Sequence, residues 1–309
     1  MNNKVLALFL IFSLLFVAAQ CGTTTPKDTA TTFIGGSNGV EIAFKETAPI
    51  AEFQQTDSVP LTVVLKNKGE SDLITGAAKV KLFGVNLDSF SIATNTYKGT
   101  SGPLKKVSSI SPEGSEQEVN FENIKYKLQI PGNEVNYALK AKVCYPYETD
   151  TFASLCIRSK LLEKEVGCTL DEGKNAERIK TGDVSSAPIQ VTSLTEKTRG
   201  SDQVQFAIKI ENKGTGKVYT ANSDCEALDK DTIKKLDSEN KISYEITNPA
   251  GVKCGSSETN KGDITLVNNA YTLNCWKTVD SVYEDKLNLK LKYVYISDTT
   301  KSIKITKTF

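Results

Sequence analysis

The chain has 309 residues, with 38 basic and 37 acidic side chains, seven cysteines and no histidine. The near-zero net charge argues against a nucleic-acid partner, which normally requires a strongly basic face. The missing histidine excludes histidine-dependent catalytic triads, histidine-ligated zinc or haem sites and the usual pH switch. A chain of this length can bury two ordinary cores, so two domains are expected.

The first twenty residues have the pattern of an export signal. Lys4 precedes Val5 to Ala19, a run in which only Ser13 is polar. The run is shorter than the about 20 apolar residues that span a bilayer, and it lies at the N-terminus, as the apolar part of a signal peptide does. We therefore expect residues 1–20 to direct export.

Cys21 follows this run directly, where small residues end it. The sequence around Cys21 resembles a lipobox, in which signal-peptide removal leaves a lipidated N-terminal cysteine. Gln20 differs from the Gly, Ala or Ser that this motif prefers. Lipidation of Cys21 is expected; cleavage after Ala19, or an uncleaved anchor, is the alternative.

The next segment is rich in threonine and contains no large apolar side chain between Gly22 and Thr32. Such a segment cannot bury enough surface to order itself. Residues 21–37 are therefore expected to tether an exported globular part to the membrane.

Most of the remaining chain alternates apolar and polar residues over short runs, which is typical of β-strands. Residues 59–65, 78–83, 204–210 and 287–293 are the clearest predicted strands. Glu226 to Leu236 has weak helical periodicity, and a turn or two of helix is expected there. Along 287–295 the odd positions are apolar, so one face of that strand should be buried.

The chain also repeats itself. Asn67-Lys68-Gly69 follows one predicted strand, and Asn212-Lys213-Gly214 follows its counterpart 145 positions later. Seven further positions match at an offset of 148: Leu139, Lys142, Tyr145, Tyr147, Asp150, Ser154 and Ile157 recur as Leu287, Lys290, Tyr293, Tyr295, Asp298, Ser302 and Ile305. Tandem duplication explains this match, and each copy is expected to end in a strand, a polar turn and a return strand.

Two sheets with one wet face each must cover one another, which predicts β-sandwiches. We expect a first sandwich over residues 38–160, a linker over 161–187 and a second sandwich over 188–309. The strand at 61–65, the Asn67-x-Gly69 turn and the strand ending at Phe83 resemble the CARDB class of immunoglobulin-like modules. These are common in archaeal and bacterial surface proteins. The resemblance implies two tandem immunoglobulin-like domains with an adhesive or scaffolding role, and it carries no catalytic residues.

Six cysteines remain in the exported part, and an even number predicts disulfides. Cys144 and Cys156 occupy the two strands of the expected hairpin, and both are replaced by lysine in the second copy. A Cys144–Cys156 bridge on the solvent face is therefore predicted.

The other four cysteines allow three connectivities. A simple up-down order of seven strands favours Cys225–Cys275 with Cys168–Cys254, and Cys168 would then pin the linker to the second domain. An extra hairpin would favour Cys225–Cys254 with Cys168–Cys275 instead. Zinc is disfavoured because no C-x-x-C spacing and no histidine are present.

Several other residues have a functional interpretation and a plainer one. The Tyr-x-Tyr pairs are expected to line the core, and Trp276 is expected to pack over a disulfide. Asp229 and Asp231, with Glu226 nearby, could hold calcium, but a solvated loop is the better interpretation. No catalytic or metal residue and no cofactor is predicted, and nothing in the sequence marks an enzyme.

The sequence thus predicts an exported, lipid-anchored cell-surface protein that is a non-catalytic adhesion, scaffold or spacer module. A receptor for a glycan or small solute, bound at the interdomain cleft or the loops at the sandwich poles, is one alternative. A subunit of a surface assembly is another. Its partners are expected to be the membrane and a protein or glycan, and no nucleic acid.

Overall fold

The computed structural model describes residues 32–92, 96–158, 168 and 179–308. The chain divides into two units, Met1–Ala30 and Thr31–Phe309, and the described residues all belong to the second. The predicted signal peptide, Cys21 and most of the tether lie outside the described residues. Within the described ranges, no helix has the length and apolar character that crossing a bilayer requires.

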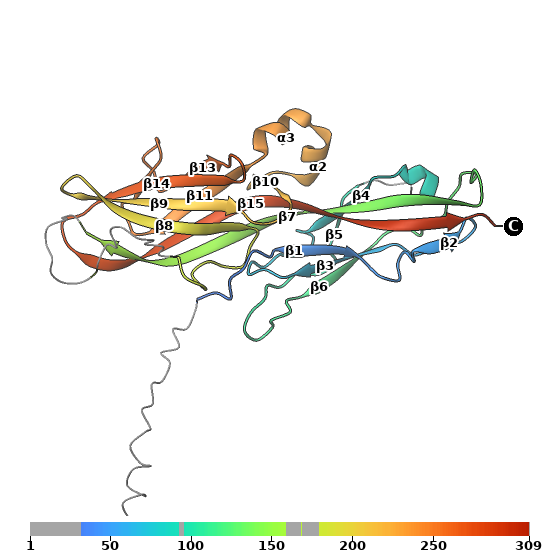
Figure 1. The fold of residues 1–309 in the computed structure, drawn as a ribbon, viewed down its shortest axis with the longest axis horizontal. Coiled ribbons are helices and arrows are strands. Elements are labelled where there is room, and N and C mark those ends of the chain that lie inside the picture. Colours follow the sequence, from blue (N-terminus) through green and yellow to red (C-terminus); the bar gives the residue numbers. More distant parts are fainter. Residues whose placement is uncertain (1–31, 93–95, 159–167, 169–178, 309) are drawn as a thin grey trace, which may run out of the picture. The chain divides into compact units, whose positions relative to one another are not determined.

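The described part is all-β apart from short helices, as the sequence predicts (Figure 1). The strands are β1 (Val40–Phe44), β2 (Glu52–Gln54), β3 (Thr62–Asn67), β4 (Lys79–Phe83), β5 (Lys98–Gly99), β6 (Glu116–Asn120), β7 (Glu134–Ile157), β8 (Ile189–Arg199), β9 (Gln203–Asn212), β10 (Lys217–Thr220), β11 (Lys241–Asn248), β12 (Lys253–Cys254), β13 (Lys261–Thr265), β14 (Ala270–Thr278) and β15 (Tyr283–Thr306). The helices are the 3-10 turn η2 (Leu87–Phe90), α2 (Cys225–Lys230) and α3 (Thr232–Ser238).

These strands form three sheets. The first has the order β1-β3-β6, the second β12-β14-β9-β8, and the largest β13-β11-β15-β7-β4-β5. In the largest sheet, β10 and β2 pair additionally with β15. All pairings are antiparallel except that of β2 with β15, which is parallel.

β7 and β15 are each 24 residues long and pair along their entire length, from Ile157 opposite Tyr283 to Glu134 opposite Thr306. Figure 1 shows the two strands side by side, joining the strands at one end of the largest sheet to those at the other. The predicted hairpin in each copy is therefore wrong. Each repeated segment is one continuous strand, and its partner is the other copy of itself.

The repeat is visible in the strand registers. Val40 in β1 pairs with Asn67 in β3, and Ile189 in β8 pairs with Asn212 in β9. Lys79 in β4 pairs with Cys144, and Ser243 in β11 pairs with Lys292, which lies 148 positions after Cys144. The two halves thus use matching partners in matching register.

The core is continuous across the described residues. Odd positions of β7 and β15 point into it, as the alternation predicts, and residues of both repeats belong to one buried cluster. β7 lies in the first predicted domain and β15 in the second, yet they form one ladder. The structure therefore does not confirm two separate sandwiches, and the boundaries 38–160, 161–187 and 188–309 stay a prediction.

Candidate functional site

The repeated tyrosines meet near the middle of the β7–β15 ladder. Tyr145 lies opposite Tyr295 and Tyr147 opposite Tyr293, on either side of the pair formed by Pro146 and Val294. Neighbouring rings have centroids 5.4 to 6.4 Å apart. All four side chains are buried, which confirms the prediction that they line the core.

Two of the tyrosines bind the asparagine of the repeated Asn-Lys-Gly turns. The Tyr147 hydroxyl donates to Asn67 Oδ1 at 2.9 Å and accepts from the backbone N–H of Ser71. The Tyr295 hydroxyl donates to Asn212 Oδ1 at 3.2 Å and accepts from the N–H of Gly216 at 2.8 Å. One buried network therefore occurs twice, once in each repeat.

The turn glycines are required by close packing against these hydroxyls. A Cβ added at Gly69 would lie 2.2 Å from the Tyr147 hydroxyl, and one at Gly214 would lie 2.2 Å from that of Tyr295. The other two tyrosines accept a backbone N–H from the first strand of each repeat, Val40 for Tyr145 and Ile189 for Tyr293.

Beyond these networks the two repeats diverge. After Gly216 the chain continues into β10, which pairs with β15 from Tyr293 to Ile296. After Ser71 the chain turns away instead, and Leu73 forms a bridge with Leu104. The edge of β7 beside the tyrosines therefore has no strand on it among the described residues.

A cavity of about 600 Å³ opens at this edge. It is lined by Glu70–Ile74, Ala77, Lys106, Pro146–Glu148, Asp150, Ala221, Asn222, Lys292 and Tyr293, so both repeats contribute to it. Its volume lies in the range of pockets that hold small ligands. The sequence gives a ligand site at the interdomain cleft as an alternative but does not indicate this strand edge, which a comparison of Pro146 with its counterpart Val294 could have revealed.

Four carboxylates, those of Glu70, Asp72, Glu148 and Asp150, and two lysines, Lys106 and Lys292, contribute the charged groups of the lining. Glu148 and Asp150 share Lys290, whose Nζ lies 2.7 Å and 3.1 Å from their carboxylates. Glu70 accepts the backbone N–H groups of Ile34 and Ser186. Asp72 accepts the backbone N–H of Lys106 at 2.9 Å. Within the described residues, neither Glu70 nor Asp72 forms an ion pair with a lysine or arginine side chain.

An insertion in the second repeat carries α2 and α3, which lie on the outer face of the sheet (Figure 1). Ala221 and Asn222, just before α2, belong to the lining of the cavity. Each helix begins at an aspartate cap, because Asp224 accepts from the N–H of Ala227 and Asp231 from that of Ile233. The expected short helix is confirmed, although it is divided in two. Of the large apolar side chains on these helices, Leu228 is buried while Ile233 and Leu236 are exposed.

Two anchors hold α2 on the sheet. One is the disulfide between Cys144 on β7 and Cys225. The other is Asp229, whose carboxylate oxygens lie 2.5 Å from Lys142 Nζ and 3.0 Å from Lys81 Nζ. Lys81 and Lys142 lie directly opposite one another on β4 and β7, so without Asp229 they would repel.

The charge on Asp229 follows from these contacts. Burial raises the pKa of its carboxyl, but the hydrogen bonds from Lys142 and Lys81 outweigh burial and hold the pKa below its ordinary value of 3.8. The predicted solvated loop at Asp229 is thus wrong, because this side chain is a nearly buried ion-pair partner. Within the described ranges, no group of three or more acidic, cysteine or histidine residues is arranged to hold a metal ion.

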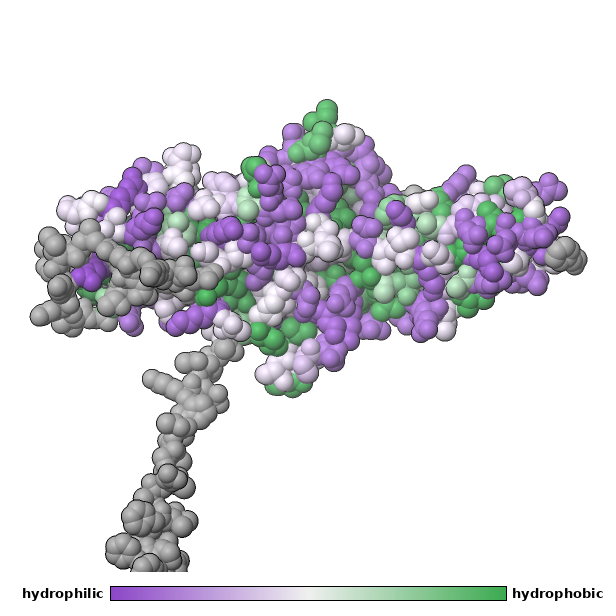
Figure 2. Space-filling model, in the orientation of Figure 1, coloured by the Kyte–Doolittle hydropathy of each residue, from purple (hydrophilic) through white to green (hydrophobic). Residues whose placement is uncertain are grey.

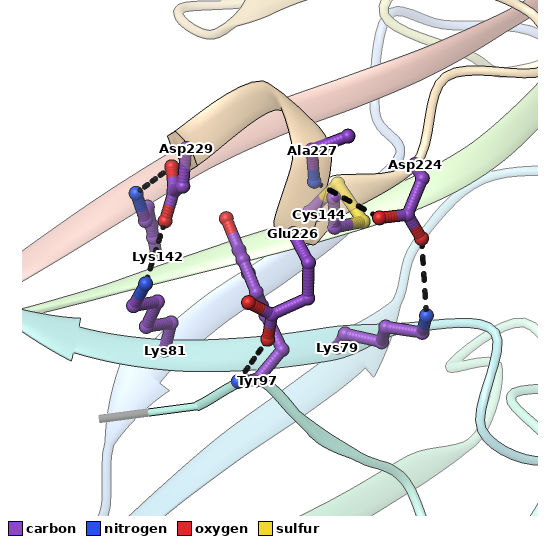
Figure 3. The surroundings of a disulfide bond; sticks show 10 residues. Lys79, Lys81, Tyr97, Lys142, Cys144, Asp224, Glu226, Ala227 and Asp229 are labelled. Atoms are coloured by element: carbon purple, nitrogen blue, oxygen red, sulfur yellow. Dashed lines mark hydrogen bonds and ion pairs between the residues drawn. A yellow bond between two sulfur atoms is a disulfide. The ribbon is translucent and has the colours of Figure 1, made fainter. Parts of the chain in front are cut away.

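Tyr97 packs beneath the same helix. Its backbone N–H donates to Glu226 Oε1 at 2.9 Å, and its ring lies 5.4 Å from Lys81 Nζ (Figure 3). Its buried hydroxyl has no hydrogen-bond partner among the described residues. Burial raises the pKa of this hydroxyl, with further contributions from Asp229 and Glu226, so the group stays protonated.

The disulfides differ from every predicted pair. The bonds are Cys144–Cys225, Cys156–Cys168 and Cys254–Cys275. Cys144 and Cys156 lie on one continuous strand, about 40 Å apart, and cannot reach each other. Cys144 is also fully buried rather than on a solvent face, because α2 covers it.

Of the other two disulfides, one lies within the second repeat and one joins the predicted linker to β7. Cys254 and Cys275 lie opposite one another on β12 and β14, in neither of the predicted arrangements. Cys168 does hold the predicted linker, but it does so through Cys156 on β7. Trp276 packs against the guanidinium group of Arg199, whose carbon lies 4.6 Å from the ring centroid.

Comparisons with known proteins assign no family. No family model and no curated protein matches the chain. Among solved structures, the secreted serine protease VesC from Vibrio cholerae is similar at 13% identity and a TM-score of 0.20. The match covers 83% of this chain and 46% of the protease. A likeness this weak carries no argument about fold or activity.

Proposed function

We propose that this chain is an exported, lipid-anchored, non-catalytic surface module for adhesion or scaffolding, built from two immunoglobulin-like repeats of the CARDB type. The observation that carries the proposal is the β7–β15 ladder, because it joins the two repeats by strand pairing and by a shared hydrophobic core. A continuous ladder resists bending between repeats, which a spacer that presents a binding surface needs.

Three disulfides support a location outside the cytoplasm, because such bonds persist in oxidising compartments. The surface supports contact with a partner. Figure 2 shows hydrophobic residues at the tip of the helical insertion, where Ile233 and Leu236 are 72% and 67% exposed. Adjacent exposed apolar side chains are typical of interaction sites.

A receptor role is the second candidate, and the cavity at the junction of the two repeats favours it. In this case the ladder holds the cavity open, and the loops contributed by both repeats select the ligand. Both candidates require the same location and anchoring. They differ in whether the contact surface is the helical tip or the cavity.

Anchoring is tested on the full chain expressed in cells that process lipoproteins. Intact mass of the membrane-extracted protein should show removal of residues 1–20 and a lipid on Cys21. The matched variant Cys21→Ala should lose the lipid and leave the membrane fraction. Wild-type protein that keeps residues 1–20, or that appears unlipidated in the medium, contradicts the anchoring.

Adhesion is tested with beads that carry residues 32–309 with the disulfides formed, which we call the ectodomain. Retention of these beads on cells or surface glycans under flow should exceed that of uncoated beads. The variant Ile233→Asp/Leu236→Asp should reduce retention if the helical tip makes the contact, whereas Val267→Asp, at another exposed apolar residue, serves as the control. Equal retention of coated and uncoated beads would contradict the adhesive role.

A further inference from the structure

Equivalent edges of β7 and β15 have different neighbours in the two repeats. In the second repeat, β10 pairs with the edge of β15 so that Tyr219 lies opposite Val294. The 148-residue offset places Pro146 on β7 at the position of Val294. This edge of β7 instead borders the cavity.

The sequence explains why no internal strand pairs there. The 145-residue offset of the Asn-Lys-Gly turns aligns Asp72 with Lys217, the first residue of β10. Lys217 lies opposite Ile296, whose counterpart is Glu148. A strand that continued from Ser71 as β10 does would set Asp72 opposite Glu148, and like charges at such positions repel.

Pro146 adds to this effect. A strand that took the course of β10 would place Ile74 opposite Pro146, which has no N–H to donate. Ile74 is 78% exposed, whereas its counterpart Tyr219 is buried. Among the described residues, the first repeat therefore lacks the internal strand that the second repeat has.

The open edge retains hydrogen-bonding groups. Phe152 donates to the oxygen of Asp183, and the oxygen of Asp150 accepts from Ser185, so even-numbered residues of β7 direct their backbone groups away from β15. By the same alternation, the N–H and C=O of Glu148 and the C=O of Pro146 point to the cavity. Among the described residues, no backbone group pairs with them.

We propose that this edge binds an extended peptide segment of a partner protein, which adds to β7 as an antiparallel strand in the way that β10 adds to β15. β10 is four residues long and provides the template for the segment. The carboxylates of Glu70 and Asp72 accept backbone N–H groups but have no ion-pair partner among the described residues, so they favour a segment with a lysine or arginine at the position of Lys217. Pairing through the backbone supplies affinity, and the carboxylates of Glu70 and Asp72 supply selectivity.

The probe is a fluorescent synthetic peptide with the sequence of residues 215–221, titrated into the disulfide-bonded ectodomain. In β10 the backbone groups of Lys217 and Tyr219 face the long ladder, whereas Val218 accepts from Asn240 on the other side. N-methylation of the peptide at its lysine and tyrosine should therefore abolish binding. N-methylation at its valine and threonine should change the affinity less than about twofold.

Protein variants test the same geometry. Pro146→Val restores a donor and should tighten binding about fivefold, and Glu148→Pro should weaken it about fivefold or more, since one hydrogen bond contributes about 1 kcal/mol. The Glu148→Pro change keeps the β7–β15 ladder, because the lost N–H faces the cavity. Thermal unfolding and near-UV circular dichroism check that each variant is folded.

Hydrogen exchange locates the peptide. In the free ectodomain the amide of Glu148 should exchange faster than that of Ile296, which β10 covers, and the peptide should slow only the former. Binding that is indifferent to the position of N-methylation, protection at Ile296 alone, or closure of the edge by a second copy would each overturn the proposal.

This inference rests on the proposed function only for where the partner is encountered. The titration uses purified protein in solution, so its failure is independent of whether Cys21 is lipidated or the beads adhere.

Discussion

Single buried side chains fix the turns that carry the repeat. Asn67 is fully buried, and its amide donates to the oxygens of Ser71 and Leu104 while its Oδ1 accepts from Gly69 and Tyr147. One side chain thus ties a turn, a distant loop and the central tyrosines together. Its counterpart Asn212 is only partly buried and makes three of the four contacts.

This difference gives a matched pair of variants. Asn67→Ala should lower the free energy of unfolding by about 2–4 kcal/mol, because buried donors and acceptors lose their partners. Asn212→Ala should cost less, since water reaches that site. Denaturant unfolding with the disulfides intact measures both, and an equal or reversed order would contradict the burial argument.

Asp229 is the residue whose loss should alter the pH dependence. Asp229→Asn leaves Lys81 and Lys142 facing each other and should cost about 1–3 kcal/mol at neutral pH. Because the folded pKa of Asp229 is below its ordinary value of 3.8, its stabilisation is present above that value and is lost as the pH falls through the folded pKa.

The difference in stability between wild type and Asp229→Asn should therefore shrink in acid. Unfolding free energies at pH 7 and near pH 3 test this prediction. The same substitution in a Lys81→Met background is the control, and there it should cost less. A difference that stays constant with pH would show that the ion pair contributes nothing.

At the scale of elements, the disulfides close loops of unequal length. The sequence separations are 81 for Cys144–Cys225, 21 for Cys254–Cys275 and 12 for Cys156–Cys168. In the loop-entropy model a longer closed loop gives more stabilisation, from about 3 to about 4.5 kcal/mol over this range.

Replacing each pair by alanine should therefore destabilise the protein most for Cys144–Cys225. The same variant should release α2 from the sheet, and hydrogen exchange of residues 225–238 should rise while that of β7 and β15 changes little. The opposite order of stabilities would indicate that strain or packing, and not loop closure, sets the contribution of these bonds.

At the scale of the whole molecule, the β7–β15 ladder couples the repeats. Leu139 and Leu287 are related by the 148-residue offset, lie in opposite halves of the ladder and are both buried. Because each long strand serves both halves, neither half can unfold without breaking the other.

The folded part of the chain should accordingly unfold in one transition. Leu139→Ala and Leu287→Ala should each lower the stability by about 2–4 kcal/mol and shift that same transition. Calorimetry with the disulfides intact measures the effect. Two separable transitions, each sensitive to only one of the variants, would instead support the independent tandem domains that the sequence predicts.

The strand content, the buried face of β15, the burial of the repeated tyrosines and the duplication all follow from the amino-acid sequence alone. These properties depend on local alternation and on residue identity, which can be read along the chain. A hairpin and one long strand, however, show the same alternation of apolar and polar residues, so the alternation does not distinguish them. Glu148 and Asp150 have the polarity of a turn, yet they continue the strand, where both carboxylates form ion pairs with Lys290 on β15.

Which strands pair, in contrast, depends on contacts that exist only in the folded molecule. The disulfides and the cavity follow from that pairing. Once β7 pairs with β15, Cys144 and Cys156 are separated and α2 lies within reach of Cys144. The open edge likewise depends on contacts between residues far apart in sequence, such as the bridge of Leu73 with Leu104. Such contacts depend on register, and local periodicity leaves register undetermined.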